Sequence, residues 1–260
     1  MVTVRDIYDY LDAWAPFELQ MDFDNAGLLV GDGGAEVSRV LVALDATMEV
    51  AKEAARKKCQ LIVTHHPLIF HPLKAVCPND PTQAVVAQLV RKNTALICAH
   101  TNLDVAEGGV NDVLMDTLGA KTTGSLEEVG TCGLGRVGEL PEAMEPWAFA
   151  RYVKKALGTC SVRAVLGERS VKKIAVCGGA GSDMVELAAR LGADAYVTAD
   201  AKHHEFLAAK ALGLTFLDAG HYATENPMMP VLTGRLQAAF APRGVEVLLS
   251  KTNKEPYIAP

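Results

Sequence analysis

Two stretches of the chain share one pattern of apolar and polar positions. Residues 38–67 read SRVLVALDATMEVAKEAARKKCQLIVTHHP, and residues 172–201 read KKIAVCGGAGSDMVELAARLGADAYVTADA. In each, a short β-branched run passes through a turn into an alanine-rich segment and returns as a second apolar run. Residues 45–47 and 182–183 can cap the alanine-rich helices. Each stretch therefore predicts a βαβ unit with a parallel strand pair and a right-handed crossover.

The two stretches align without a gap when one is shifted by 134 positions, so that Val40 meets Ile174 and Val63 meets Val197. A third apolar strand follows in each half, in residues 94–104 and 214–225. The extra residues of the first half fit in the loop PLIFHPLKAVCPND. Chance similarity is the alternative, because all βαβ units are rich in Val, Ile, Ala and Gly. The matched polar residues that follow the strands favour a repeat.

We therefore expect an α/β protein made of two related halves with mostly parallel sheets. The first half is expected to span residues 1–125, and residues 226–260 are expected to return to it. The second half is expected to span residues 126–225.

Most histidines of the chain directly follow predicted strands. Six of the seven histidines lie at or shortly after the ends of these strands, and the seventh, His71, lies in the loop PLIFHPLKAVCPND. Open parallel sheets bind their ligands at the carboxyl ends of the strands. The sequence therefore predicts a functional site built from the residues at these ends, namely His65, His66, His100 and Asp104 in the first half, and Asp200, Lys202, His203, His204, His221 and Glu225 in the second.

Imidazole nitrogens and carboxylate oxygens together suit zinc, iron, manganese or nickel. At least three histidines and two carboxylates are expected to converge, which exceeds the four ligands of one structural ion. This surplus favours two ions that share a carboxylate at the ~3.5–4 Å separation of two-metal sites. Neighbouring side chains of a strand point to opposite faces, so His65 and His66 are expected to bind different ions. For the His-His pair or a His-x-x-x-carboxylate motif taken alone, the alternative is a position on the surface or a role in supporting a metal ligand.

The net charge, the apolar runs and the cysteines argue against several classes of protein. The net charge of −6 argues against nucleic-acid binding driven by bulk charge. No apolar run approaches the ~18 residues of a membrane span, and the N-terminus has no signal-peptide pattern. Six cysteines form no C-x-x-C pair, which indicates reduced thiols and argues against a thiolate zinc site. We therefore expect a cytoplasmic protein.

Several motifs resemble those of one family. THHPLIF, AHTNLD and GHYATE, together with DFDNAGLLVGD and VTADAKHHE, are similar to motifs of the Nif-three-like dinuclear metal-centre family, whose members are often called GTP cyclohydrolase I type 2-like proteins. The resemblance extends from the N-terminus to SKTNKEPYI near the C-terminus. One departure is His203, which stands where an aromatic residue is expected, so His204 is the better equivalent of the motif histidine.

The resemblance implies a two-domain α/β subunit, a toroidal homohexamer and a two-metal site between the domains. The metals it implies are two divalent ions per subunit, such as zinc, iron or manganese. Longer family members carry an extra domain between the halves, whereas here residues 120–170 form only a short connection. Carried over by motif, the metal ligands are His65, His66, Asp104, His221 and Glu225, with Glu225 as the bridge.

Two functions stay open at this point. The first is a metal-dependent hydrolase of the GTP cyclohydrolase type that acts on a nucleotide or phosphorylated small molecule, with His100 and His204 as proton-transfer residues. The second is a non-catalytic metal-binding or scaffold protein. CGGAGSD at residues 177–183 can cradle a phosphate or allow close packing of strand on helix. Asp24 and Asn25 can line the site or form a capped turn.

Overall fold

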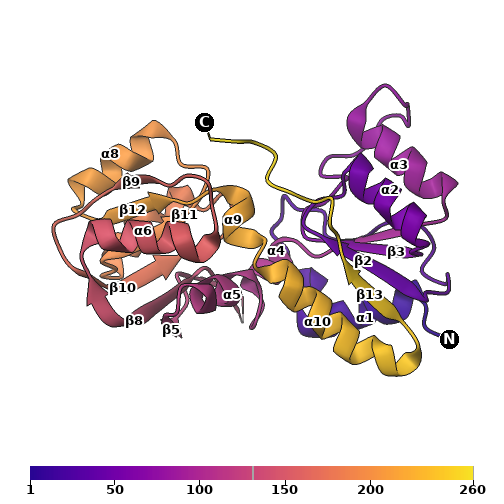
Figure 1. Ribbon diagram of the computed structural model, residues 1–260, viewed down its shortest axis with the longest axis horizontal. Coiled ribbons are helices and arrows are strands. Elements are labelled where there is room, and N and C mark those ends of the chain that lie inside the picture. The colour runs from indigo at the N-terminus through magenta and orange to yellow at the C-terminus, as the bar shows by residue number, and fades with distance from the viewer. Residues whose placement is uncertain (131, 260) are drawn as a thin grey trace. The chain divides into compact units, whose positions relative to one another are not determined.

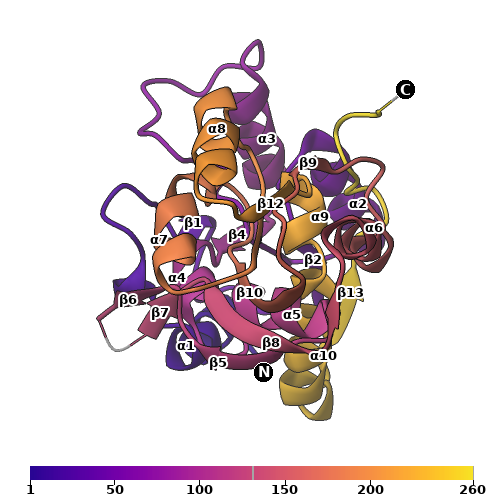
Figure 2. The ribbon, with the colours of Figure 1, turned by 90° about the vertical axis from the view of Figure 1, so that its left-hand side faces the viewer.

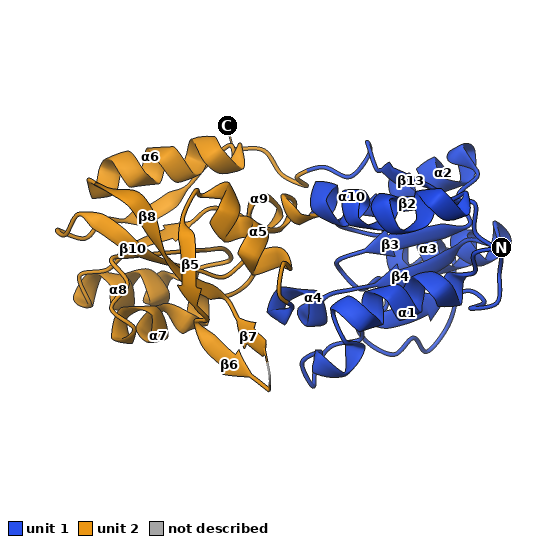
Figure 3. Ribbon diagram, turned by 90° about the horizontal axis from the view of Figure 1, so that it is seen from below, with its two compact units in different colours: residues 1–106, 229–254 blue, residues 107–228, 255–260 orange. Residues whose placement is uncertain are grey.

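The computed structural model describes residues 1–130 and 132–259. The chain forms two compact units, which Figure 3 shows in blue and orange. The first unit contains Met1–Ala106 and Met229–Lys254, and the second contains Glu107–Met228 and Glu255–Pro260. The first unit ends near residue 106 rather than near residue 125, because the helix and strand that follow residue 106 pack with the second sheet.

The first unit is built on a five-stranded sheet with the order β1-β4-β3-β2-β13. The three middle strands are buried and parallel, as expected for strands covered on both faces. The edge strand β13 is parallel to β2, whereas β1 is antiparallel to β4. The strands are β1 (Gly27–Val30), β2 (Arg39–Ala43), β3 (Leu61–Thr64), β4 (Ala95–Cys98) and β13 (Glu246–Leu249).

Helices cover both faces of this sheet. Figure 1 shows α2 (Met48–Lys57) and α3 (Pro81–Arg91) on one side and α1 (Val4–Trp14) and α10 (Met228–Phe240) on the other. Leu41 and Ile62 of the sheet pack with Val50 of α2 and Leu89 of α3. The short elements are η1 (Phe17–Leu19), α4 (Thr101–Val105) and η3 (Ala241–Arg243).

The second unit contains a six-stranded sheet with the order β5-β8-β10-β11-β12-β9. Its central strands β10, β11 and β12 are parallel, and the other strands join them antiparallel. The strands are β5 (Lys121–Gly124), β8 (Arg136–Met144), β9 (Arg163–Val165), β10 (Val171–Val176), β11 (Ala195–Thr198) and β12 (Thr215–Asp218), and a separate hairpin pairs β6 (Glu127–Val129) with β7 (Cys132–Leu134).

Alternating residues of the second sheet face different helices. Ile174 packs with Phe149 of α6 and Leu114 of α5, whereas Ala175 packs with Val185 of α7 and Ala209 of α8. Figure 2 shows α6 and the α7–α8 pair on opposite sides of the sheet. Within the described part of the chain, no helix has the length and apolar character needed to cross a membrane. The helices are α5 (Val110–Thr117), α6 (Pro146–Leu157), η2 (Ser182–Met184), α7 (Val185–Arg190), α8 (His203–Ala211) and α9 (His221–Glu225).

The central strands of the two sheets follow the same order. The parallel strands β2, β3 and β4 of the first unit correspond to β10, β11 and β12 of the second. The strands β3 and β11 occupy residues 61–64 and 195–198, which preserves the shift seen in the sequence. The predicted α/β class with a parallel core is therefore confirmed, and antiparallel strands complete each sheet.

The C-terminal segment is fixed to the first unit by one buried carboxylate. Glu53 of α2 has a side chain that is 1% exposed, and it lies 2.8 Å from Lys57 Nζ. It accepts hydrogen bonds from the hydroxyls of Ser250 and Thr252 and from the backbone of Lys251. Burial raises the pKa of Glu53, but the bonds from Lys57, Ser250 and Thr252 outweigh it and lower the pKa to about 2.

We expect Glu53→Gln to lower the free energy of unfolding by roughly 3 kcal/mol at pH 7, since the pKa of Glu53 is lowered from 4.5 to about 2 and one pKa unit corresponds to about 1.4 kcal/mol. A lowered folded-state pKa stabilises the protein above the unfolded value, and this contribution is lost as the pH falls from about 4.5 toward about 2. Urea unfolding at pH 7 and pH 3 measures it. The exposed Glu49 of the same helix provides the control Glu49→Gln, and an equal loss in both variants would contradict this role.

Candidate metal centre

Three histidines and one aspartate gather at the carboxyl ends of β3 and β4. His65 and His66 directly follow β3, and His100 precedes α4, which carries Asp104. One ring nitrogen of each of the three histidines lies within 4.8 Å of those of the other two. The Nε2 atom of His65 lies 3.6 Å from Oδ1 of Asp104. We call these four residues the first cluster.

The Nδ1 atom of each histidine in the first cluster is held by an oxygen acceptor at 2.8 Å. The acceptor is the carbonyl oxygen of Ala99 for His65, Asp45 for His66 and Asp24 for His100. A carbonyl or an ionised carboxylate can only accept, so Nδ1 carries the proton in each ring. The lone pair then lies on Nε2, which is the usual arrangement of a metal-binding histidine supported by a second group.

The acceptors of the first cluster are themselves held in place. Asn253 donates to Asp45 Oδ2 at 3.0 Å, and its Oδ1 accepts from the backbone of Asp45 at 3.1 Å. Asp24 accepts from the hydroxyl and the backbone N–H of Thr101. The C-terminal motif and the DFDNAGLLVGD motif thus support His66 and His100, respectively.

A second cluster consists of Asp200, His221 and Glu225 of the second unit. Asp200 follows β11, and α9 begins at His221 shortly after β12. The Nδ1 atom of His221 lies 2.8 Å from Oδ2 of Asp200, and its Nε2 lies 3.2 Å from Oε2 of Glu225. As in the histidines of the first cluster, Nδ1 of His221 is held by an oxygen acceptor and the lone pair lies on Nε2. Glu225 is 3% exposed, so its carboxylate needs a positively charged or hydrogen-bonding neighbour.

The glycines of CGGAGSD pack against α9, the helix that carries His221 and Glu225 of the second cluster. Gly179 has a φ of +64°, and its N–H donates to Thr224 Oγ1 at 3.0 Å. A Cβ atom at Gly179 would lie 2.1 Å from Oε1 of Glu225. The N–H of Gly178 donates to Asn111 Oδ1. These contacts favour the packing interpretation of the motif, because the backbone N–H groups of both glycines are bonded within the unit.

Not all of the predicted polar residues join a cluster. His204 lies at the start of α8, its side chain is 73% exposed, and its Nε2 lies 3.7 Å from Glu205 of the same helix. Lys202 and His203 are also exposed. Among the described residues, no group of possible metal ligands includes His204. His204 is therefore a weaker candidate for proton transfer than His100, which lies within the first cluster.

Sequence reasoning did not predict which carboxylates hold the histidines. The sequence suggests only a helix-capping role for Asp45, and it places Asp200 among the polar residues that follow the strands without pairing it with a histidine. In the structure each of the two holds the Nδ1 of a predicted ligand. A capped turn is the simpler interpretation of Asp24 from the sequence, and the structure places it against His100. Asp45 follows a parallel strand, as Asp200 does, and this is the signal that could have identified it.

The donor atoms of both clusters fit divalent metal ions. Each contains an Nε2 atom with a fixed orientation and at least one carboxylate that is mostly buried, Asp104 in the first and Glu225 in the second. Imidazole and carboxylate ligands suit zinc, iron and manganese, whereas all six cysteines are free thiols and none belongs to either cluster.

Comparison with known proteins identifies similar chains over nearly the whole length of this one. A GTP cyclohydrolase 1 type 2 homolog of Clostridium acetobutylicum is 33% identical over 261 residues, which cover 98% of this chain and 97% of the relative. A GTP cyclohydrolase 1 type 2 of Helicobacter pylori is 33% identical over 227 residues, covering 87% and 88% of the two chains. The crystal structure of a hypothetical protein of Staphylococcus aureus, SA1388, superposes with a TM-score of 0.93 at 32% identity and covers 99% of each chain.

The family model for Duf34/NIF3 (NGG1p interacting factor 3) matches residues 2–256. This range contains both clusters and the residues that support them. The match confirms the family that the motifs predicted. On the motifs, the fold and this match together, the chain belongs to the Duf34/NIF3 family.

Proposed function

We propose that the two clusters supply the ligands of one pair of divalent ions and that the protein is a hydrolase acting on a nucleotide or a phosphorylated small molecule. The observation that carries the proposal is the orientation of four histidines. Each directs Nδ1 to an oxygen acceptor at 2.8 Å, which leaves Nε2 as the metal-binding atom. A set of surface histidines has no reason to share this arrangement.

In this proposal the ligands are those that the family resemblance implies. Glu225 is the bridging carboxylate, because a carboxylate has two oxygens and can bind both ions at once. A metal pair lowers the pKa of a bound water and stabilises negative charge on the reacting group. The ligands are His65, His66, Asp104, His221 and Glu225.

His100 is the proposed proton-transfer residue. Its Nδ1 is held by Asp24, whose side chain is fully buried. Burial raises the pKa of Asp24, but hydrogen bonds from His100 and Thr101 outweigh it and lower the pKa to about 2. Asp24 is therefore ionised at neutral pH and fixes the tautomer of His100. The Nε2 atom of His100 can then accept a proton from a water or return it to a leaving group.

The names of the relatives support a nucleotide substrate, since both are called GTP cyclohydrolase 1 type 2 or its homolog. We also propose that the protein assembles as a homohexamer, as the family resemblance suggests, and that it is cytoplasmic, as the reduced cysteines suggest. Light scattering that gives the mass of a monomer at micromolar concentration would overturn the hexamer.

The test is elemental analysis of protein reconstituted with zinc, iron or manganese, followed by a screen of nucleotides and phosphoesters. We expect two ions per subunit and hydrolysis that depends on them. His100→Gln is expected to lower kcat by about 10²–10⁴-fold, the range for general acid–base catalysis, while it retains both ions. An unchanged kcat in the His100→Gln variant would show that His100 does not transfer the proton.

A metal-binding protein without catalytic activity is the second candidate. It is favoured by the burial of two proposed ligands, because His65 is 0% exposed and Glu225 is 3% exposed. Structural metal sites are closed, whereas catalytic sites keep one position open for water or substrate. Two bound ions without hydrolysis of any compound in the screen would support this candidate over the hydrolase.

A further inference from the structure

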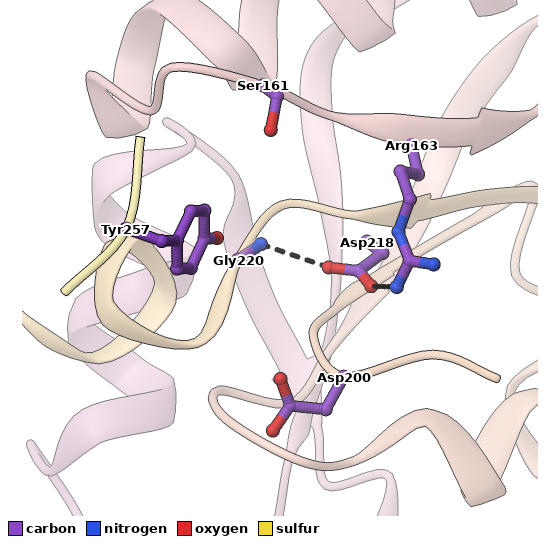
Figure 4. A pocket seen from close by; sticks show the side chains of 6 residues that line it. All are labelled: Ser161, Arg163, Asp200, Asp218, Gly220 and Tyr257. Carbon is purple, nitrogen blue, oxygen red and sulfur yellow. Dashed lines mark hydrogen bonds and ion pairs between the residues drawn. The ribbon is translucent and has the colours of Figure 1, made fainter. Parts of the chain in front are cut away.

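The second unit contains a pocket of about 340 Å³ beside the second cluster. Figure 4 shows its lining side chains, which surround a common space. It lies at the carboxyl ends of β11 and β12, where sheets of this kind bind ligands, and its volume falls within the range of small-molecule sites. The lining residues are Ser161, Arg163, Asp200, Asp218, Gly220 and Tyr257.

The pocket offers several hydrogen-bonding groups to a ligand. Arg163 uses Nη2 to bind Asp218 and the carbonyl oxygen of Ala201, which leaves the donors on Nε and Nη1. The side-chain hydroxyls of Ser161 and Tyr257 add two groups that can both donate and accept. Asp200 uses Oδ2 to hold His221, which leaves Oδ1 as an acceptor.

The balance of charge in the pocket excludes an anion as the preferred ligand. The carboxylate of Asp218 is paired with Arg163 and accepts from the N–H groups of Ala201 and Gly220. The charges of Arg163 and Asp218 therefore cancel, and Asp200 leaves the pocket with a net negative charge. A phosphate would be repelled by Asp200. A neutral ligand with several hydroxyl groups can instead accept from the donors and donate to Asp200.

Tyr257 adds an aromatic surface to these polar groups. Its side chain reaches the pocket from the C-terminal segment and is 48% exposed. Burial, and then the nearby Glu255, raise the pKa of Tyr257, so its hydroxyl is protonated and can donate at neutral pH. An exposed ring with a hydroxyl donor, next to a carboxylate, is suited to the C–H face and the diol of a sugar.

We propose that this pocket binds the ribose of a nucleotide, with the 2′,3′-diol donating to Asp200 and accepting from Ser161, Tyr257 or Arg163. That the ribose belongs to a nucleotide rests on the proposed function, whereas the preference for a neutral polyhydroxyl ring rests on the lining alone. Asp200 would link the two sites, because it contacts the sugar through Oδ1 and holds the predicted ligand His221 through Oδ2.

The test measures binding of sugars that carry neither base nor phosphate to the full-length protein without added metal, by saturation-transfer NMR titration. The probes are methyl β-ribofuranoside and its 2-deoxy analogue, with ribose 5-phosphate as the anionic comparison. We expect the riboside to bind about tenfold more tightly than the deoxy analogue, and Tyr257→Ala to weaken its binding about tenfold, as for one lost hydrogen bond and the lost ring contact. Trp147→Ala, which removes a 62% exposed ring in the same unit, should leave binding unchanged.

Three outcomes would overturn the proposal. They are the absence of riboside binding, equal binding by the Tyr257→Ala variant, and tighter binding of ribose 5-phosphate that is lost in Arg163→Gln, which would indicate an anion site. None of these measurements requires hydrolysis. A protein that binds the riboside but hydrolyses nothing would refute the proposed hydrolase and retain the ribose pocket, and the converse result would refute only the pocket.

Discussion

Glu225→Ala is expected to remove both metal ions, whereas His65→Ala and His66→Ala should each weaken one. Glu225 is the proposed bridge, because the two oxygens of a carboxylate can bind two ions at once. Its side chain is 4% exposed and 3.2 Å from Nε2 of His221, so its loss also removes a partner of another proposed ligand. Metal content per subunit after reconstitution and gel filtration is the measurement.

Glu225→Gln provides the matched control, because it preserves the size of the side chain and removes the charge. We expect it to lose metal nearly as completely as Glu225→Ala while its circular dichroism spectrum stays that of the wild type. If Glu225→Ala retains two ions while His65→Ala or His66→Ala loses both, the bridge is misassigned. If the wild-type protein never exceeds one ion per subunit with zinc, iron or manganese, the dinuclear site itself is wrong.

The parallel core was predictable from the sequence because its strands are short, apolar and buried on both faces. The pairs β2–β3 and β10–β11 fall where the pattern placed them. The unit boundary was less predictable, since α5 is amphipathic and can pack on either sheet. It joins the second sheet, where Leu114 and Met115 lie in the core with Phe149.

The histidines of the candidate site were predictable because they directly follow strands, but most of their supporting groups were not. Asp24 lies 76 residues from His100, and Asn253 lies 208 residues from Asp45. Such pairs are formed by tertiary contacts between loops, which leave no periodic signal in a single sequence. The contact between Gly179 and Glu225 was not predictable either. A glycine next to a strand most often reflects local packing, so the sequence gives no sign of a distant partner.

Gly179→Ala is expected to disrupt the metal site although it removes no ligand. The new Cβ atom would lie 2.1 Å from Oε1 and 3.1 Å from Cδ of Glu225, and 3.3 Å from Cε1 of His221. Glu225 is buried and its helix is anchored by the bond from Gly179 to Thr224, so the carboxylate must move out of position. Displacing a ligand in this way should weaken metal binding by at least about 10–100-fold, as loss of a supporting group does.

The control for this prediction is Gly213→Ala. Gly213 has a φ of +65°, nearly the +64° of Gly179, but nothing lies within 4 Å of the point that its new Cβ atom would occupy. Both substitutions therefore impose the same backbone strain, roughly 1–2 kcal/mol for a residue in the left-handed region, and they differ in the contact with Glu225. Metal titration and thermal unfolding of both variants separate the two effects. Equal metal affinity in the two variants would show that Gly179 has only a conformational role and that the position of Glu225 tolerates its displacement.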